Sequence, residues 1–151
     1  MKKPHRIAAG GIIIKDDTVL LVRYRGASGG TYLVGPGGGL EDDENVVQAV
    51  IRETREETNV IVRPVRPVII EDLECIRYKM IKVWMICDAV GGNLSATDEA
   101  KKEGILEAAW FTKPQLAREI VYPALLIPSD WNQMRSENWR VECLPSRKAD
   151  I

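Results

Sequence analysis

The sequence predicts a single α/β domain in which helices cover a mixed β-sheet. Strand-like segments stand on both sides of one well-marked central helix, an order that is typical of layered α/β folds. The 151 residues suit one hydrophobic core, and no repeat or Pro/Ser-rich linker divides the sequence. We therefore expect one domain over residues 1–151, with a flexible tail at 145–151.

The first third of the chain predicts a β-hairpin followed by a glycine-rich loop. Apolar residues dominate 7–14 and 18–25, and the turn residues 15–17 separate them. A short strand at 32–34 leads into 35–39, where four of the five residues are glycine. Closely spaced glycines permit positive φ and a close approach of the backbone to a ligand.

A helix is predicted from about Glu44 to Thr58, because apolar residues recur there at helical spacing. Acidic residues just before and at its start interact favourably with the positive end of the helix dipole. The face expected to be buried contains Val47, Val50, Ile51, Thr54 and Thr58. Three glutamates, at positions 53, 56 and 57, follow the spacing i, i+3, i+4 and therefore stack on one side of the helix.

The rest of the chain predicts further strands and short helices. Pro64 and Pro67 restrict the segment after the central helix to an edge strand or an interrupted strand. Further strands are expected near 68–75, 77–89 and 108–111. Pro114 suits the first turn of a helix, and another short helix is expected around 131–138.

The composition argues against several classes of chemistry. A formal net charge of −1 gives no reason to expect nonspecific nucleic-acid binding. His5 is the only histidine, and Cys75, Cys87 and Cys143 lack metal-ligand spacing, so histidine-based nucleophiles and thiolate metal sites are poorly supported. The scattered cysteines and the lack of an apolar run of about 18 residues favour a reduced cytoplasm and no membrane contact. Catalysis by this chain would have to depend on carboxylates.

The three stacked glutamates predict a metal site. Like charges at this spacing cost about 0.2–0.5 kcal/mol per pair, and the single guanidinium of Arg52 cannot neutralise all three. A hard divalent cation such as Mg²⁺ prefers oxygen ligands and would balance the surplus charge. A solvated helix face with ion pairs is the alternative for a glutamate-rich helix. Gly38 and Glu44, at fixed intervals before Arg52, favour the metal site.

Residues 38–60 carry a longer pattern. Gly38, Glu44, Arg52-Glu53 and Glu56-Glu57 stand at the intervals Gly-x5-Glu-x7-Arg-Glu-x2-Glu-Glu. This spacing resembles the Nudix box, which identifies MutT-like nucleotide pyrophosphohydrolases and implies an α/β/α sandwich around a mixed sheet. Asn59 replaces the late glycine of that box, and Thr54 replaces an aliphatic residue. Asn tolerates the left-handed conformation just past a helix end, so we expect an active site despite both departures.

The resemblance implies Mg²⁺- or Mn²⁺-dependent hydrolysis of a nucleoside diphosphate linked to another group, with metal-activated water as the nucleophile. By position, the metal ligands would be Glu53, Glu56, Glu57 and the backbone carbonyl near Gly38. Arg52 would orient the carboxylates, while Gly37 and Glu44 would support the site. Glu53, Glu56 and Arg52 are thus also the first catalytic candidates.

The general base would be a glutamate of the box or one in the loop before the last predicted strand. Glu103 is the first candidate in that loop, Glu107 and Glu99 are the others, and a solvated loop glutamate is the alternative for each. Arg23 and Arg25 alternate on one strand and so share a face that could meet substrate phosphates, unless they are ordinary surface residues.

The substrate is left open at this point. Tyr78 follows Val60 by 18 residues, a spacing similar to that of diadenosine polyphosphate members, and the proline that marks many ADP-ribose members is missing. A nucleoside triphosphate or a dinucleoside polyphosphate is therefore expected first, with ADP-ribose or a nucleotide sugar next. A noncatalytic module that senses a nucleotide or ADP-ribose is the alternative function. Homodimers are common in the family, so a dimer is a further expectation.

Overall fold

The computed structural model describes residues 2–149. Its strands are β1 (His5–Lys15), β2 (Thr18–Arg25), β3 (Thr31–Val34), β4 (Gly37–Gly39), β5 (Val60–Cys75), β6 (Lys79–Gly92), β7 (Glu107–Thr112), β8 (Val121–Tyr122), β9 (Glu142–Cys143) and β10 (Arg147–Ala149). Its helices are α1 (Val46–Thr58), α2 (Asp98–Lys102), α3 (Lys113–Leu116), the 3₁₀ helix η1 (Ala124–Leu126) and α4 (Trp131–Arg135).

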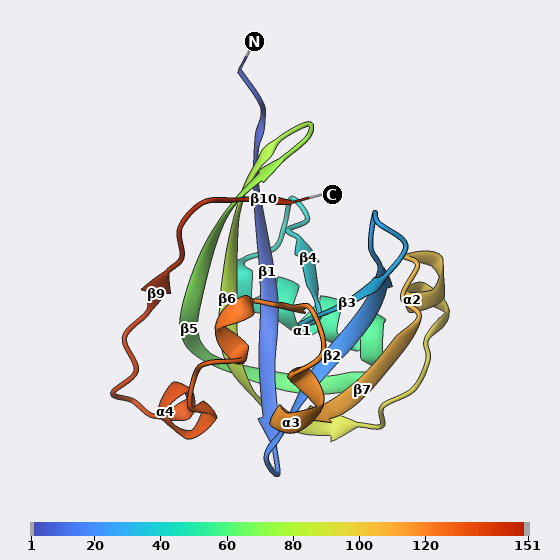
Figure 1. Cartoon of the computed structure of the whole chain (residues 1–151), viewed down its shortest axis with the longest axis vertical. Helices are drawn as coiled ribbons and strands as arrows, with labels where there is room; N and C mark the ends of the chain where they lie inside the picture. Colours follow the sequence, from blue (N-terminus) through green and yellow to red (C-terminus); the bar gives the residue numbers. More distant parts are fainter. Residues whose placement is uncertain (1, 150–151) are drawn as a thin grey trace.

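The strands form one mixed sheet that opens beside the glycine loop. Its main path runs β10-β5-β6-β1-β2-β3-β8, with β1 parallel to β6 and β5 antiparallel to β6. β1 and β2 share register only at Ile14–Val19 and Lys15–Thr18, and then diverge (Figure 1). Beyond that point β4 takes the place of β2 beside β1. The divergence brings the glycine loop into the middle of the sheet.

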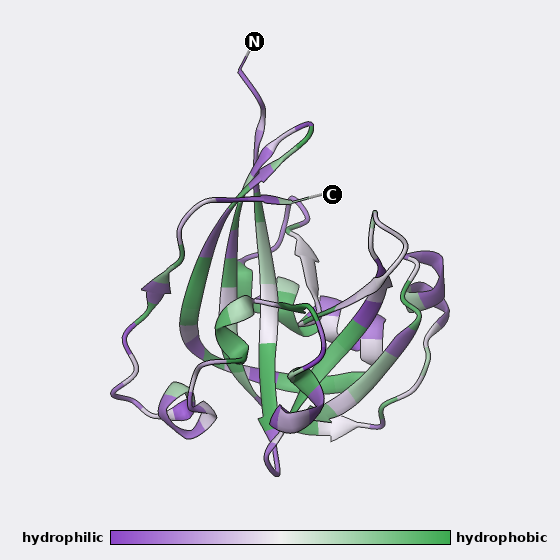
Figure 2. Cartoon of the chain, viewed as in Figure 1, coloured by the Kyte–Doolittle hydropathy of each residue, from purple (hydrophilic) through white to green (hydrophobic). Residues whose placement is uncertain are grey.

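Two helical layers cover the sheet, as the predicted α/β/α sandwich requires. Alternate residues of β1 face opposite layers: Ala9 and Ile13 pack with Val50 of α1, whereas Ile12 packs with Leu126 of η1. The second layer consists of α3, η1 and α4. Figure 2 shows hydrophobic residues along the sheet and the first half of α1, and hydrophilic residues where the end of α1 meets α2.

The ends of α1 follow local sequence rules. Asn45 caps its start, because its side-chain oxygen accepts a hydrogen bond from the Gln48 N–H. The Gln48 side-chain oxygen in turn accepts one from the Asn45 N–H. Asn59 ends it in the left-handed conformation, with φ 64°, as its replacement of glycine predicts. The first turn contains no acidic residue, because Glu44 lies before the cap and bonds elsewhere.

The predicted buried face of α1 is partly wrong. Val50, Thr54 and Thr58 are buried, but Val47 and Ile51 are 41% and 36% exposed. The side buried in their place includes Ala49, Glu53 and Glu57. The face is rotated because α1 packs beside the glycine strand β4, which leaves room for carboxylates rather than aliphatic side chains.

The chain after the helix differs from the prediction mainly at its end. β5 is one long strand, and two of its three irregularities against β6 lie at Pro64 and Pro67, as an interrupted strand predicts; the third lies between Ile61 and Val62. The flexible tail expected over 145–151 is wrong for Arg147–Ala149, which form β10 and pair in parallel with β5. Backbone pairing to a free strand edge holds this polar segment, and hydropathy carries no signal of it. Residues 150 and 151 lie outside the described part of the chain.

None of the helices in the described part of the chain combines the length and the apolar character that a membrane crossing needs.

Candidate active site

Three carboxylates from two helices converge at one point. Glu53 and Glu57 of α1 and Glu103, the residue that ends α2, each place an oxygen within 4.8 Å of the others. Thr97 at the start of α2 accepts the Ala100 N–H and donates its hydroxyl to the Glu56 carbonyl of α1. This bond joins the two helices and so positions Glu103 over the α1 glutamates.

Burial makes this cluster electrostatically costly. Glu57 is 1% exposed, and the Gly37 N–H reaches its carboxylate only at 3.3 and 3.4 Å. Burial, and next the charge of Glu53, raises the pKa of Glu57 well above its ordinary value. Burial also raises the pKa of Glu53 and of Glu103. A site with several carboxylate oxygens and excess negative charge fits a hard divalent cation such as Mg²⁺ or Mn²⁺.

Arg52 binds the carboxylates around the cluster. Its Nη1 donates to Glu53 at 3.0 Å and to Glu56 at 3.1 Å, and its Nε and Nη2 donate to Glu44. Nη2 also donates to the Gly39 carbonyl at 3.2 Å. One planar guanidinium therefore bonds two α1 glutamates, Glu44 and the glycine strand at the same time.

The glycine loop provides close approach rather than unusual dihedral angles. The positive-φ glycines of the described chain are Gly29, Gly92 and Gly104, so none lies in the loop. A Cβ on Gly38 would lie 2.6 Å from Glu53 Oε1, and a Cβ on Gly37 would lie 2.5 Å from the Ala9 carbonyl oxygen. Glycine is needed here because the carboxylate and β1 occupy the space of a side chain.

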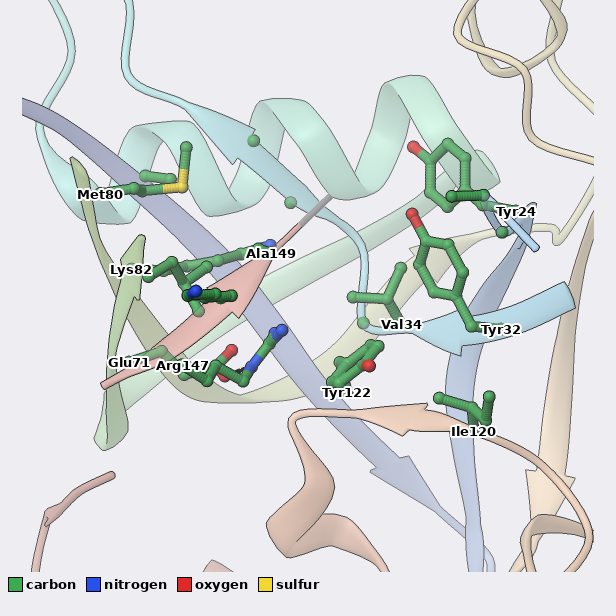
Figure 3. A pocket seen from close by; sticks show the side chains of 18 of the residues that line it. Tyr24, Tyr32, Val34, Glu71, Met80, Lys82, Ile120, Tyr122, Arg147 and Ala149 are labelled. Atoms are coloured by element: carbon green, nitrogen blue, oxygen red, sulfur yellow. Dashed lines mark hydrogen bonds and ion pairs between the residues drawn. The ribbon is translucent and has the colours of Figure 1, made fainter. Parts of the chain in front are cut away.

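A cavity of about 620 Å³ adjoins the carboxylate cluster, and Glu57, Gly37 and Gly38 lie in its wall. This volume is typical of small-molecule sites. Tyr24 and Tyr32 stack with their ring centroids 5.7 Å apart, and Tyr32 meets the edge of Tyr122 at 5.8 Å. In the view of Figure 3, Tyr24 and Tyr32 lie on one side of the cavity, opposite Glu71, Lys82 and Arg147, and Tyr122 lies between the two groups.

The structure brings together most of the residues singled out in the sequence. Arg25 and Tyr78 line the cavity, and Arg6 lies 4.8 Å above the Tyr78 ring. Glu56 is not one of the three converging carboxylates, although Arg52 keeps it beside them. Among the three loop glutamates, Glu103 alone belongs to the converging group.

Arg23 is not brought to the cavity. Its guanidinium pairs with both oxygens of Glu119 at 3.0 Å and with Glu107 at 2.9 Å, and it lies on the opposite side of β2 from Tyr24. We therefore do not retain Arg23 as a phosphate contact. The same pairing occupies Glu107, the alternative candidate for the base.

Sequence reasoning missed several residues of the cavity wall, among them Tyr24, Glu71, Lys82 and Arg147. One signal was available: Lys82 alternates with the buried residues Met80 and Trp84 in an apolar strand. A lysine at such a position faces the interior. Arg147 gave no signal, because it lies in a polar segment near the end of the sequence.

Comparisons with known proteins agree with this geometry. Residues 4–130 match the NUDIX domain family. The chain is 36% identical over 98 residues to an ADP-ribose pyrophosphatase of Methanocaldococcus jannaschii; the match covers 64% of this chain and 58% of that protein. The chain thus spans less than two thirds of the length of this curated relative.

Solved structures share the fold. A NUDIX hydrolase from Nitrosomonas europaea superposes with a TM-score of 0.67 at 25% identity, over 86% of this chain and 89% of that one. An ADP-ribose pyrophosphatase from Streptococcus suis superposes with a TM-score of 0.67 at 23% identity, over 91% of this chain and 98% of that one.

Proposed function

Because the chain belongs to the Nudix hydrolase family, we propose that it hydrolyses the pyrophosphate bond of a nucleoside diphosphate linked to another group, with ADP-ribose as the first candidate substrate. The observation that carries this proposal is the convergence of Glu53, Glu57 and Glu103 at the wall of the tyrosine-lined cavity. The 36% identity to an ADP-ribose pyrophosphatase moves ADP-ribose ahead of nucleoside triphosphates and dinucleoside polyphosphates.

The chemistry follows from these carboxylates. Glu53 and Glu57 would hold the divalent ion, with Glu56 and Glu103 beside them. When bound, the ion would neutralise pyrophosphate charge and lower the pKa of a water molecule. Arg52 keeps the Glu53 carboxylate in place, so that little reorganisation is needed during the reaction.

Glu103 is our candidate for the group that accepts the proton of the attacking water. Unlike Glu53 and Glu57, it is exposed to solvent, so it can pass that proton on. Its raised pKa makes it a stronger base than an ordinary glutamate. Tyr24 and Tyr32 offer ring faces for a nucleobase and hydroxyl donors for a sugar.

The test is a panel of ADP-ribose, nucleotide sugars, nucleoside triphosphates and dinucleoside polyphosphates, assayed with Mg²⁺, with Mn²⁺ and with EDTA. We expect turnover of ADP-ribose with either metal and none with EDTA. Turnover that is unaffected by EDTA would contradict the metal mechanism. Tight binding of ADP-ribose without turnover under any condition would favour the noncatalytic sensor instead.

A further inference from the structure

Lys82 places an unpaired ammonium group at the cavity wall. It lies on β6 between Met80 and Trp84, and its Nζ lies 4.2 Å from the centroid of the Trp84 ring. Within residues 2–149, no hydrogen bond or ion pair to another side chain uses this Nζ. Burial lowers the pKa of Lys82, and the carboxylates of Glu57 and Glu71 oppose that effect. A half-buried ammonium that lacks an ion-pair partner gains from an incoming anion.

Glu71 is already held by two other donors, and within the described chain no hydrogen bond or ion pair joins it to Lys82. The Trp84 indole N–H donates to Glu71 Oε1 at 2.8 Å, and Arg147 Nε donates to Oε2 at 3.0 Å. Glu71 is 2% exposed, so its carboxylate has no freedom to turn. It serves to hold Trp84 and Arg147 in place.

Arg147 supplies a second cation with free donors. Its guanidinium lies 4.0 Å from the centroid of the Tyr122 ring, and Nε is the nitrogen that bonds Glu71. Within the described chain, its two terminal nitrogens form no hydrogen bond to another side chain. Figure 3 shows the Lys82 and Arg147 side chains extending into the cavity from the same side.

The charges of the wall favour an anion at this end of the cavity. Five cations line the cavity as a whole, namely Arg6, Arg25, Lys82, Arg147 and Lys148. The acidic residues of the wall are Glu57 and Glu71, and the first of these belongs to the carboxylate cluster. Arginine and lysine N–H groups together suit a phosphoryl group, which offers several oxygens to separate donors.

We propose that Lys82 and Arg147 form a phosphoryl-binding subsite, which holds the phosphate of the substrate that lies away from the carboxylate cluster. The assignment of that phosphate to a substrate rests on the proposed function. Arg147 lies beyond residues 4–130, the range that matches the family, so a segment outside that match completes the subsite.

Binding of inorganic pyrophosphate in EDTA, measured by calorimetry, tests the subsite without metal or turnover. Lys82→Met keeps the aliphatic stem over Trp84 and removes the charge, and Lys79→Met, at an exposed position of the same strand, is the matched control. We expect at least tenfold weaker binding for Lys82→Met and no change for Lys79→Met. Lys82→Arg should retain most of the affinity, and added salt should weaken binding to the wild type.

Arg147 needs a paired design, because its removal would leave Glu71 buried without its cation. Glu71→Gln alone is therefore compared with Glu71→Gln combined with Arg147→Met. We expect the double variant to bind pyrophosphate at least fivefold more weakly than Glu71→Gln. Equal affinities in both comparisons, or no pyrophosphate binding by the wild type, would overturn the subsite. Should Lys82→Met fail to fold, Lys82→Gln takes its place.

The subsite and the hydrolase proposal can fail separately. Glu53→Gln should lose hydrolysis yet bind pyrophosphate in EDTA as well as the wild type does. In the hydrolysis assay, Lys82→Met should raise KM about tenfold and leave kcat nearly unchanged. A wild type that binds pyrophosphate through Lys82 but hydrolyses nothing would refute the hydrolase and support the subsite. Hydrolysis by the wild type, with an unchanged KM in Lys82→Met, would support the hydrolase and refute the subsite.

Discussion

Arg52 and Glu44 form a two-point ion pair, in which Nε lies 2.5 Å from Oε2 and Nη2 lies 2.9 Å from Oε1. Glu44 also accepts the Glu41 N–H at 2.9 Å, so its carboxylate is fixed in the loop before α1. These bonds lower the pKa of Glu44 to about 2, the Arg52 bond having the largest effect. The same guanidinium reaches Glu53, so Glu44 sets the position of a candidate metal ligand through Arg52.

Arg52→Lys should therefore weaken metal binding, because an ammonium cannot make the two-point bond and reach Glu53 at once. Loss of a group that orients a metal ligand commonly costs about 10–100-fold in affinity or activity. The measurement is Mn²⁺ binding by calorimetry, together with the Mg²⁺ dependence of hydrolysis. Arg55→Lys, on the exposed side of the same helix, is the control. Equal metal affinities for the two variants would contradict this role.

Gly38→Ala should disturb the site more than the fold. The added methyl would lie 2.6 Å from Glu53 Oε1, so the carboxylate would have to leave its position against β4. We expect Mg²⁺ affinity to fall about tenfold or more, as for other changes that displace a ligand. Gly30→Ala is the matched control, since nothing lies within 4 Å of its added Cβ and that glycine also lines the cavity. Wild-type activity of Gly38→Ala at limiting Mg²⁺ would refute the assigned contact.

Glu57→Gln should stabilise the metal-free protein at neutral pH. Because burial raises the folded-state pKa of Glu57, the folded state binds this proton more tightly than the unfolded state, whose pKa is near 4.5. The resulting stability is present below pH 4.5 and is lost as pH rises through the folded-state pKa. Glu53 acts in the same direction. The depressed pKa of Glu44 has the opposite effect on stability, but only below pH 4.5. Between pH 5 and pH 8 the pH dependence of stability therefore reports the carboxylate cluster without Glu44.

The readout is Tm in EDTA across that pH range. The Tm of the wild type should fall as pH rises, and the Tm of Glu57→Gln should fall less. The difference between the two falls should be about 2–4 °C for each 1 kcal/mol of relieved strain. Added Mg²⁺ should raise the Tm of the wild type more than that of the variant, since the ion relieves the same repulsion. Parallel Tm curves for the two proteins would show that Glu57 is not strained by its neighbours.

Glu103→Gln should lower kcat more than the same change at Glu99 or Glu107. Glu103 lies within 4.8 Å of the α1 carboxylates, whereas Glu107 is paired with Arg23. Removal of a general base typically costs about 10²–10⁴-fold in rate. Two readouts separate a base from a metal ligand. Loss of a base changes the pH profile of kcat, whereas saturating Mg²⁺ would rescue the loss of a metal ligand. A larger loss at Glu99 or Glu107 would assign the base elsewhere.

The sequence predicted the fold and the central helix well, because both depend on local or repeated signals. The hairpin of β1 and β2, the irregularities of β5 at its two prolines and the left-handed Asn59 all follow from residue type and spacing. The buried face of α1 was predicted less well, since a helical wheel weighs hydrophobicity alone. Glu53 and Glu57 are buried in place of Val47 and Ile51, because glycines opposite them leave space for carboxylates.

What the sequence determined by itself is the set of carboxylates on α1, because the helical repeat places residues 53, 56 and 57 together before any tertiary contact forms. Tertiary structure alone decided which groups join them. Glu103 arrives through α2, and Arg147 arrives through the pairing of β10 with β5. Contacts between residues so far apart in the chain depend on how strands and helices pack, and local spacing carries no information about that packing.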